Sequence, residues 1–329
     1  MPSSHRLSVA PMMDWTDRHC RVFHRLLAPN ARLYTEMVHA QAVLQGDRGR
    51  LLGFDAVERP LALQLGGSDP AALAEAARIA ESLGYDEVNL NVGCPSDRVQ
   101  AGRFGACLMR EPALVAECTA AMRKAVAIAV TVKCRLGVDE QEDYVDLLRF
   151  IDIVAASGVK LFAVHARKAW LQGLSPKENR EVPPLRYEQV YRLKQERPDL
   201  CIVINGGIET TDAITLHLEH VDGVMIGRAA YHTPYLLHRM DHALFAAASP
   251  LPDRAELLRQ LRPYVEQQLA AGVALKHMIR HVLGLFHGQP GGRGFRQVLS
   301  EGAHRARADW SLVEQALART TMSTGEQTR

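Results

Sequence analysis

The sequence has no apolar run long enough to cross a bilayer, and its first residues lead into a predicted strand without a signal-peptide core. Its six cysteines are scattered singly along 329 residues, without the paired spacing of a metal site. We therefore expect a cytoplasmic protein with free thiols, no membrane segment and no metal. The net charge of only +2 argues neither for nor against a polyanionic partner.

The basic charge is concentrated near the C-terminus. Residues 251–310 contain nine Lys or Arg and five Asp or Glu, whereas residues 1–250 carry a small net negative charge. Strand-like segments stop near residue 245, and Ala248-Ser-Pro-Leu-Pro-Asp253 is expected to be a linker. Amphipathic stretches predict helices over 254–269, 273–286, 295–303 and 310–318. We predict a small C-terminal helical-bundle domain over residues 246–329.

Eight short segments rich in Val, Ile and Leu alternate with helical segments in the first 245 residues. The predicted strands are 7–10, 33–38, 61–65, 87–92, 129–135, 161–165, 201–205 and 223–227. Nearly continuous apolar strands are typical of strands that are buried on both faces. The alternation predicts an α/β fold, a (β/α)8 or TIM barrel over residues 1–245, with the C-terminal ends of all strands at one mouth.

The stretch Glu87-Val-Asn-Leu-Asn-Val-Gly-Cys-Pro95 contains the strongest candidate for catalysis. Gly93 and Pro95 end the strand, which leaves Cys94 on the rim and Asn91 inside the mouth. A thiol can give or take a proton, and an amide can bond a flat polar ring. A buried structural thiol is the alternative, but the position of Cys94 between Gly93 and Pro95 favours exposure and catalysis.

Polar residues at other strand ends are expected to face the same mouth. Asn205-Gly-Gly207 and Gly227-Arg228 favour a phosphate site, because glycines allow close approach and helix starts attract anions. A simple turn from strand to helix is the alternative. Gln64 could bond an imide edge, and Arg135 points the same way as Lys133.

Lys133 and His165 are each open to more than one interpretation. Lys133 could be a cation beside an electron-rich ring, a Schiff-base lysine of an aldolase acting on a sugar phosphate, or a lysine extending out of the barrel. His165 stands alone on an apolar strand, so it could be a hydrogen-bonded core histidine rather than a ligand-binding one.

Eight motifs in order along residues 7–235 resemble the tRNA-dihydrouridine synthase family. They are Pro11-Met-Met-Asp-Trp-Thr-Asp17, Thr35-Glu-Met37, Leu63-Gln-Leu-Gly-Gly67, Asn89-Leu-Asn-Val-Gly-Cys-Pro95, Val132-Lys-Cys-Arg135, His165-Ala-Arg167, Asn205-Gly-Gly207 and Ile226-Gly-Arg228. Ser175-Pro-Lys-Glu-Asn-Arg180 and Gly291-Gly-Arg-Gly-Phe-Arg296 resemble the A-type subfamily, which reduces uridines at positions 20 and 20a of the tRNA D-loop.

This resemblance implies reduction of uridine to 5,6-dihydrouridine with FMN as cofactor and NADPH as reductant. Hydride would pass from FMN to uracil C6, and Cys94 would protonate C5. The implied FMN-binding residues are Pro11, Met12, Met13, Gln64, Lys133, His165, Asn205, Gly206, Gly207, Gly227 and Arg228. Those implied for uracil and tRNA are Asn91, Arg135, Lys177, Arg180, Arg293 and Arg296. The basic C-terminal domain would contact the tRNA backbone.

Three other functions remain open from the residues alone. A Schiff-base aldolase would be colourless and would use Lys133. A flavin enzyme with a small substrate fits the barrel, although it would not need a basic helical domain. A non-enzymatic RNA-binding module would not explain why polar residues converge at one barrel mouth.

Overall fold

The structure is a computed structural model that describes residues 3–141, 143–245 and 251–325. The chain divides into two compact units, Met1–Asp14 with Ala31–Gly227, and Trp15–Asn30 with Arg228–Arg329. This division differs from the expected boundary after residue 245, since residues 15–30 and 228–245 group with the C-terminal helices. Half of the expected linker, residues 248–250, lies outside the described residues.

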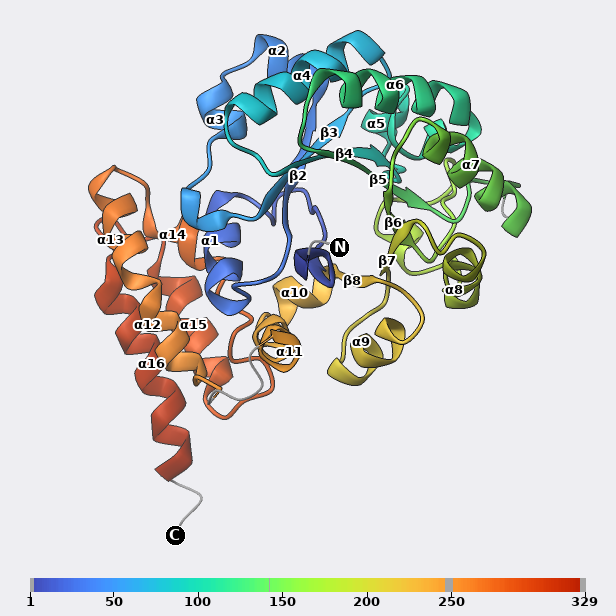
Figure 1. The fold of residues 1–329 in the computed structure, drawn as a ribbon. Helices are drawn as coiled ribbons and strands as arrows, with labels where there is room; N and C mark the ends of the chain where they lie inside the picture. The colour runs from blue at the N-terminus through green and yellow to red at the C-terminus, as the bar shows by residue number, and fades with distance from the viewer. Residues whose placement is uncertain (1–2, 142, 246–250, 326–329) are drawn as a thin grey trace. The chain divides into compact units, whose positions relative to one another are not determined.

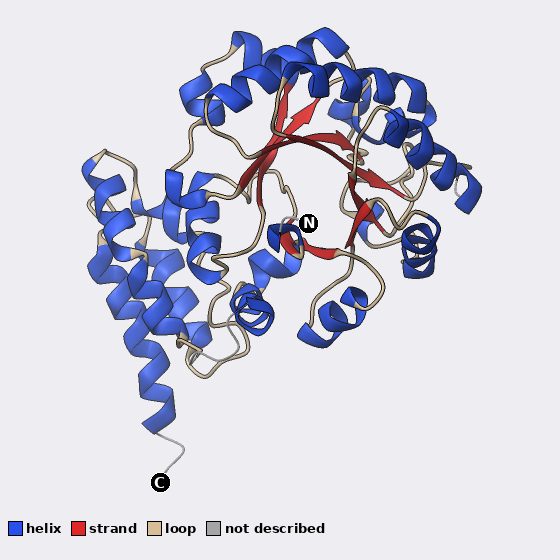
Figure 2. Cartoon of the chain, viewed as in Figure 1, coloured by secondary structure: helices blue, strands red, loops and turns tan. Residues whose placement is uncertain are grey.

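The first unit is a barrel of eight parallel strands, as predicted (Figures 1 and 2). The strands are β1 Leu7–Val9, β2 Leu33–His39, β3 Leu61–Gly66, β4 Glu87–Val92, β5 Ala129–Arg135, β6 Leu161–His165, β7 Cys201–Asn205 and β8 Gly223–Ile226. Each strand from β2 to β7 pairs with the next strand in sequence, and β8 also pairs with β1. The ring closes between β1 and β2 through a bridge from Ser8 to Arg32, where the Val9 N–H donates to the Arg32 carbonyl at 3.0 Å.

Helices connect the strands of this unit. They are α2 Ala40–Gln45, α3 Arg48–Leu52, α4 Pro70–Ser82, α5 Asp97–Ala101, α6 Pro112–Ala125, α7 Tyr144–Ala156, α8 Tyr187–Glu196 and α9 Thr211–Leu218. As the sequence predicts, the Asp69 side chain caps α4 and Pro70 is its first residue. The sequence does not predict α8, which has no side-chain cap at its first turn and of which only Val190 and Leu193 are buried.

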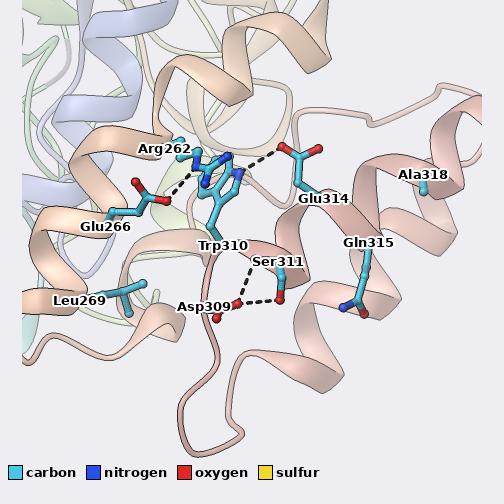
Figure 3. Close-up of a pocket in the computed structure, with 9 residues that line it drawn as sticks. All are labelled: Arg262, Glu266, Leu269, Asp309, Trp310, Ser311, Glu314, Gln315 and Ala318. Carbon is cyan, nitrogen blue, oxygen red and sulfur yellow. Dashed lines mark hydrogen bonds and ion pairs between the residues drawn. The ribbon is translucent and has the colours of Figure 1, made fainter.

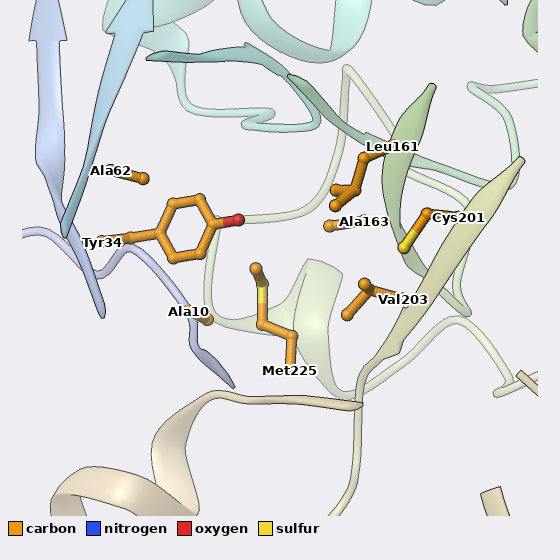
Figure 4. Packing of buried hydrophobic residues seen from close by; sticks show 8 residues of the cluster. All are labelled: Ala10, Tyr34, Ala62, Leu161, Ala163, Cys201, Val203 and Met225. Atoms are coloured by element: carbon orange, nitrogen blue, oxygen red, sulfur yellow. The ribbon is translucent and has the colours of Figure 1, made fainter. Parts of the chain in front are cut away.

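The barrel interior is apolar in its middle and polar toward its ends. Figure 4 shows the apolar part, where side chains from several strands meet: Ala10, Tyr34, Ala62, Leu161, Ala163, Cys201, Val203 and Met225. At the N-terminal end of β4, the buried Glu87 carboxylate accepts hydrogen bonds from Tyr34 at 2.9 Å and Thr131 at 2.6 Å and pairs with His5 at 2.6 Å. Burial alone would raise the pKa of Glu87, but the His5 partner, the Arg32 charge and these bonds lower it.

The second unit is helical. Its helices are α1 Arg18–Leu27, α10 Arg228–His232, α11 Tyr235–Phe245, α12 Arg254–Gln260, α13 Arg262–Ala270, α14 Leu275–Ile279, α15 Gly292–Gly302 and α16 Trp310–Gly325. The single helix predicted over 254–269 is wrong, because α12 ends at Gln260 and α13 begins at Arg262. Pro263 lies in the first turn of α13, where a proline is tolerated, but it could not continue α12. The helix predicted over 273–286 is shorter, since α14 ends at Ile279 and turns follow. Within the described ranges, no helix combines the length and apolarity that a bilayer span requires.

Candidate active site

Cys94 lies in a tight turn that follows β4 and precedes α5. The Asn91 Oδ1 atom accepts hydrogen bonds from the backbone N–H of Gly93 at 3.1 Å and of Cys94 at 3.0 Å. The thiol is partly exposed, and its Sγ lies 3.5 Å from the Ser96 hydroxyl. The Asn91 side chain therefore fixes the backbone that presents the Cys94 thiol at the barrel mouth.

A chain of buried amides extends from this turn into the barrel. Asn91 Nδ2 donates to Gln64 Oε1 at 2.9 Å, and Gln64 Nε2 donates to Asn89 Oδ1 at 2.8 Å. Asn89 Nδ2 in turn donates to the Thr131 hydroxyl at 2.8 Å. Gln64 and Asn91 each still have a second amide N–H for a ligand, and Gln64 Oε1 also has a second lone pair, whereas both lone pairs of Asn91 Oδ1 accept from Gly93 and Cys94. The chain thus orients Gln64 and Asn91 while leaving them able to bind a polar ring.

Lys133 and Asn205 meet inside the mouth. Lys133 is partly buried, and its Nζ donates to Asn205 Oδ1 at 3.1 Å, while Asn205 Nδ2 donates to the Met225 carbonyl at 2.7 Å. The lysine therefore does not extend out of the barrel. Burial, assisted by the charge of Arg135, lowers the pKa of Lys133 to about 8.

Lys133 and Arg135 form a cationic cluster beside the His165 ring at the ends of β5 and β6. Burial and then these two cations lower the pKa of His165 well below its ordinary value, so its imidazole is neutral. Burial also lowers the pKa of Arg135 to about 10, opposed chiefly by the Cys94 thiol. In the described part of the chain, no carboxylate pairs with any of the three residues. An electropositive cluster without internal acids favours an anionic ligand.

The turn after β7 has the backbone that the sequence predicts for a phosphate site. Gly206 and Gly207 have φ angles of +113° and +65°, which favour glycine. A Cβ added at Gly206 would lie 2.5 Å from the His165 ring, whereas one added at Gly227 would meet nothing within 4 Å. The Tyr187 hydroxyl donates to the Gly206 carbonyl at 2.7 Å and holds the turn. With the adjacent cationic cluster, this arrangement fits the predicted FMN.

Arg135 connects the Cys94 turn to the loop that follows β6. Its Nε donates to the Gly93 carbonyl at 2.9 Å, and its Nη1 donates to the carbonyls of Asn179 at 2.8 Å and Lys168 at 3.1 Å. The same loop carries Arg180, whose charge contributes to lowering the pKa of Arg135. Arg135 is therefore committed to the protein backbone through at least part of its guanidinium.

The remaining predicted residues lie in several places. Lys177 and Arg180 are exposed in the β6 loop, and Pro11, Met12 and Met13 follow β1, with Met13 56% exposed. Arg228 begins α10, and Arg293 and Arg296 are exposed on α15, all three within the second unit.

Four residues of this arrangement are absent from the sequence-based candidates: Asn89, Asn179, Tyr187 and Gln100, whose Nε2 donates to the carbonyls of Pro95 and Leu171. Asn89 lies two residues before Asn91 on the same strand, so strand alternation predicts that both side chains point to the same face. Asn89 could therefore have been found from the sequence. The roles of the other three depend on contacts between distant loops.

The second unit has a hollow of its own, shown in Figure 3, with a volume of about 670 Å³. Its polar side chains already bind one another: Arg262 pairs with Glu266 at 2.7 Å, and Trp310 donates to Glu314 at 3.0 Å. Such internal pairing gives no indication of a ligand. Within the residues that the structure describes, no three His, Cys, Asp or Glu side chains gather as a metal site.

Comparison with known proteins identifies the family. The pattern of the dihydrouridine synthase (Dus) family matches residues 8–321. The chain belongs to the dihydrouridine synthase family. Its relatives include proteins named tRNA-dihydrouridine(20/20a) synthase from Xanthomonas axonopodis pv. citri and from Vibrio cholerae. The first is 71% identical, covering 97% of this chain and 95% of the relative, and the second is 55% identical, covering 97% and 98%.

Family membership makes the chain an enzyme and an oxidoreductase, and the resemblance found in the sequence is confirmed. The Schiff-base aldolase alternative is thereby set aside. Among solved structures, a 2-naphthoyl-CoA reductase aligns with a TM-score of 0.55 and 12% identity, over 72% of this chain and 50% of that chain. At this identity the likeness concerns the fold alone.

Proposed function

We propose that this dihydrouridine synthase reduces uridine to 5,6-dihydrouridine at positions 20 and 20a of the tRNA D-loop, with FMN as cofactor and NADPH as reductant. The observation that carries the proposal is the Cys94 thiol, held at the barrel mouth beside a cationic cluster without carboxylates. The names of the relatives, which align over nearly the whole chain, support the substrate and its positions. An enzyme acting on tRNA is expected in the cytoplasm.

The residues that would hold FMN are those the sequence names. Pro11, Met12 and Met13 would lie along the flavin, and Gln64 and Lys133 would bind its ring. The phosphate tail would be held by His165, Asn205, Gly206, Gly207, Gly227 and Arg228. When bound, FMN supplies the hydride for uracil C6 after reduction by NADPH. The neutral His165 ring has no side-chain hydrogen bond within the described residues, which leaves it available to this cofactor.

Cys94 would complete the reduction as general acid. Its Sγ–H bond breaks as a C–H bond forms at uracil C5, so hydride and proton together saturate the C5–C6 double bond. Lys133 and Arg135 lie close enough to Cys94 to interact with it electrostatically. A positioned acid of this kind contributes about 10²–10⁴-fold to the rate.

The uridine must leave its stack to reach the mouth, at a cost of about a few kcal/mol. Asn91 would hold the extruded uracil with the amide N–H that Gln64 does not use, and Arg135 would assist it. Lys177, Arg180, Arg293 and Arg296, all exposed, would contact the tRNA and set its orientation.

The test is Cys94→Ala, with Cys107→Ala as the matched control. Cys107 is also a partly exposed thiol, but its Sγ contacts the Phe104 carbonyl instead of the mouth. We expect Cys94→Ala to retain FMN and tRNA affinity and to lose about 10²–10⁴-fold in dihydrouridine formation, measured by mass spectrometry of digested tRNA. Full dihydrouridine formation by Cys94→Ala would contradict the acid assignment. A colourless protein that takes up no added FMN would contradict the cofactor.

A further inference from the structure

Gln100 joins two loops at the barrel mouth. It lies in α5, directly after the Cys94 turn, and its Nε2 donates to the Pro95 carbonyl at 2.8 Å and to the Leu171 carbonyl at 2.7 Å. Leu171 belongs to the loop after β6, 71 residues further along the chain. Both N–H bonds of the Gln100 amide are therefore used to hold the two loops together.

The Leu171 peptide is a fixed anchor for this side chain. Its N–H donates to Asp139 Oδ1 at 2.8 Å, and the Asp139 N–H donates to the Ala169 carbonyl at 2.8 Å. Asp139 also pairs with Arg110, which lies at the end of the segment after β4. The Leu171 carbonyl accepts from Gln100, after β4, and the Leu171 N–H donates to Asp139, after β5. The Leu171 backbone therefore connects the loops after β4, β5 and β6.

Arg135 makes a second connection between the same two loops. It holds the Gly93 carbonyl on one side and the Asn179 carbonyl on the other. Gly93 and Pro95 are the two neighbours of Cys94. Each neighbour's carbonyl is therefore bound by a side chain that also binds the β6 loop, which carries Lys177 and Arg180.

We propose that Gln100 is a positioning residue, which holds the Cys94 thiol at a fixed place relative to the β6 loop. Through this connection, the tRNA contacts of the β6 loop set the distance from Cys94 to the uracil it protonates. The inference rests on the proposed function. A displacement of the acid by about 1 Å costs on the order of 10²-fold in rate, so a side chain that prevents it acts on turnover.

The experiment compares wild type with Gln100→Met, which keeps the side-chain length and removes both donors. We expect kcat for dihydrouridine formation to fall about 10- to 100-fold, while KM for tRNA changes less than about threefold. FMN content and NADPH oxidation should be unchanged. Gln45→Ala is the control, because Gln45 is exposed on α2 and bonds only within that helix; it should match wild type.

Gln100→Glu tests the donor role separately, since its carboxylate has the same shape but can only accept hydrogen bonds. It should lose activity as Gln100→Met does; full activity would overturn the proposal. The rate at which iodoacetamide alkylates Cys94 without tRNA, read by peptide mass spectrometry, should rise several-fold in both variants.

Three results would overturn the positioning role. They are an unchanged kcat with an unchanged alkylation rate, a raised KM for tRNA with unchanged kcat, and loss of FMN or of cooperative unfolding in both variants. The proposed function fails differently, through a wild-type enzyme that forms no dihydrouridine, and the alkylation comparison still tests Gln100 in that case.

Discussion

Replacing Asn91 tests whether one amide determines the conformation of the Cys94 turn. The side chain makes three hydrogen bonds, two from the N–H groups of Gly93 and Cys94 and one to Gln64. A hydrogen bond contributes about 0.5–1.5 kcal/mol net, so Asn91→Ala should lower the free energy of unfolding by about 2–4 kcal/mol. The turn should also loosen, since nothing replaces the Oδ1 acceptor.

Asn91→Asp separates the two effects. Its carboxylate keeps the acceptor for Gly93 and Cys94 but cannot donate to Gln64, so an oxygen faces Gln64 Oε1. We expect Asn91→Asp to be destabilised while its turn stays in place. Urea unfolding measures the stability, and the rate of Cys94 alkylation by iodoacetamide reports the turn.

The expected alkylation rate is several-fold higher in Asn91→Ala and near wild type in Asn91→Asp. Asn30→Ala is the control, because the Asn30 amide bonds Asp241 at 3.0 Å in the second unit. The reasoning is refuted if Asn91→Ala loses less than about 0.5 kcal/mol and keeps the wild-type alkylation rate. Equal alkylation rates in the two Asn91 variants would also refute it.

The glycine turn and a buried histidine provide further tests. A Cβ added by Gly227→Ala meets no protein atom within 4 Å, so the stability should not change. Because the FMN phosphate is proposed to bind at Gly227, the added Cβ should weaken FMN affinity in a flavin titration. Gly206→Ala combines a φ of +113° with a clash against His165, and urea unfolding should show a loss of about 1–3 kcal/mol. Burial lowers the pKa of His24 from 6.5 to about 3. Between these values the unfolded chain binds more protons, so the free energy of unfolding falls as the pH is lowered; His24→Gln should flatten this dependence in urea titrations.

Much of the barrel follows from local sequence. Nearly continuous apolar runs predict all eight strands, because burial on both faces selects Val, Ile and Leu. Glycine or proline directly follows several of them, such as β4, β7 and β8, and ends the strand there. Helix α4 follows from Asp69 and Pro70 for equally local reasons. Helices with few buried residues, such as α8, give no comparable signal, and Pro263 divides a segment whose apolar pattern predicts one helix.

In the candidate site, too, some features follow from the local sequence and others only from the tertiary structure. The sequence alone determines which residues stand at the strand ends, since strand phase and the breakers are local properties: Cys94, Asn91, Lys133 and Asn205 are found without any contact being known. The tertiary structure decides what each side chain binds. The Lys133–Asn205 bond joins residues 72 positions apart, and the Gln100–Leu171 bond joins residues 71 positions apart. Only closure of the barrel and packing of its loops bring such groups within hydrogen-bonding distance, and no local pattern in the chain encodes that distance.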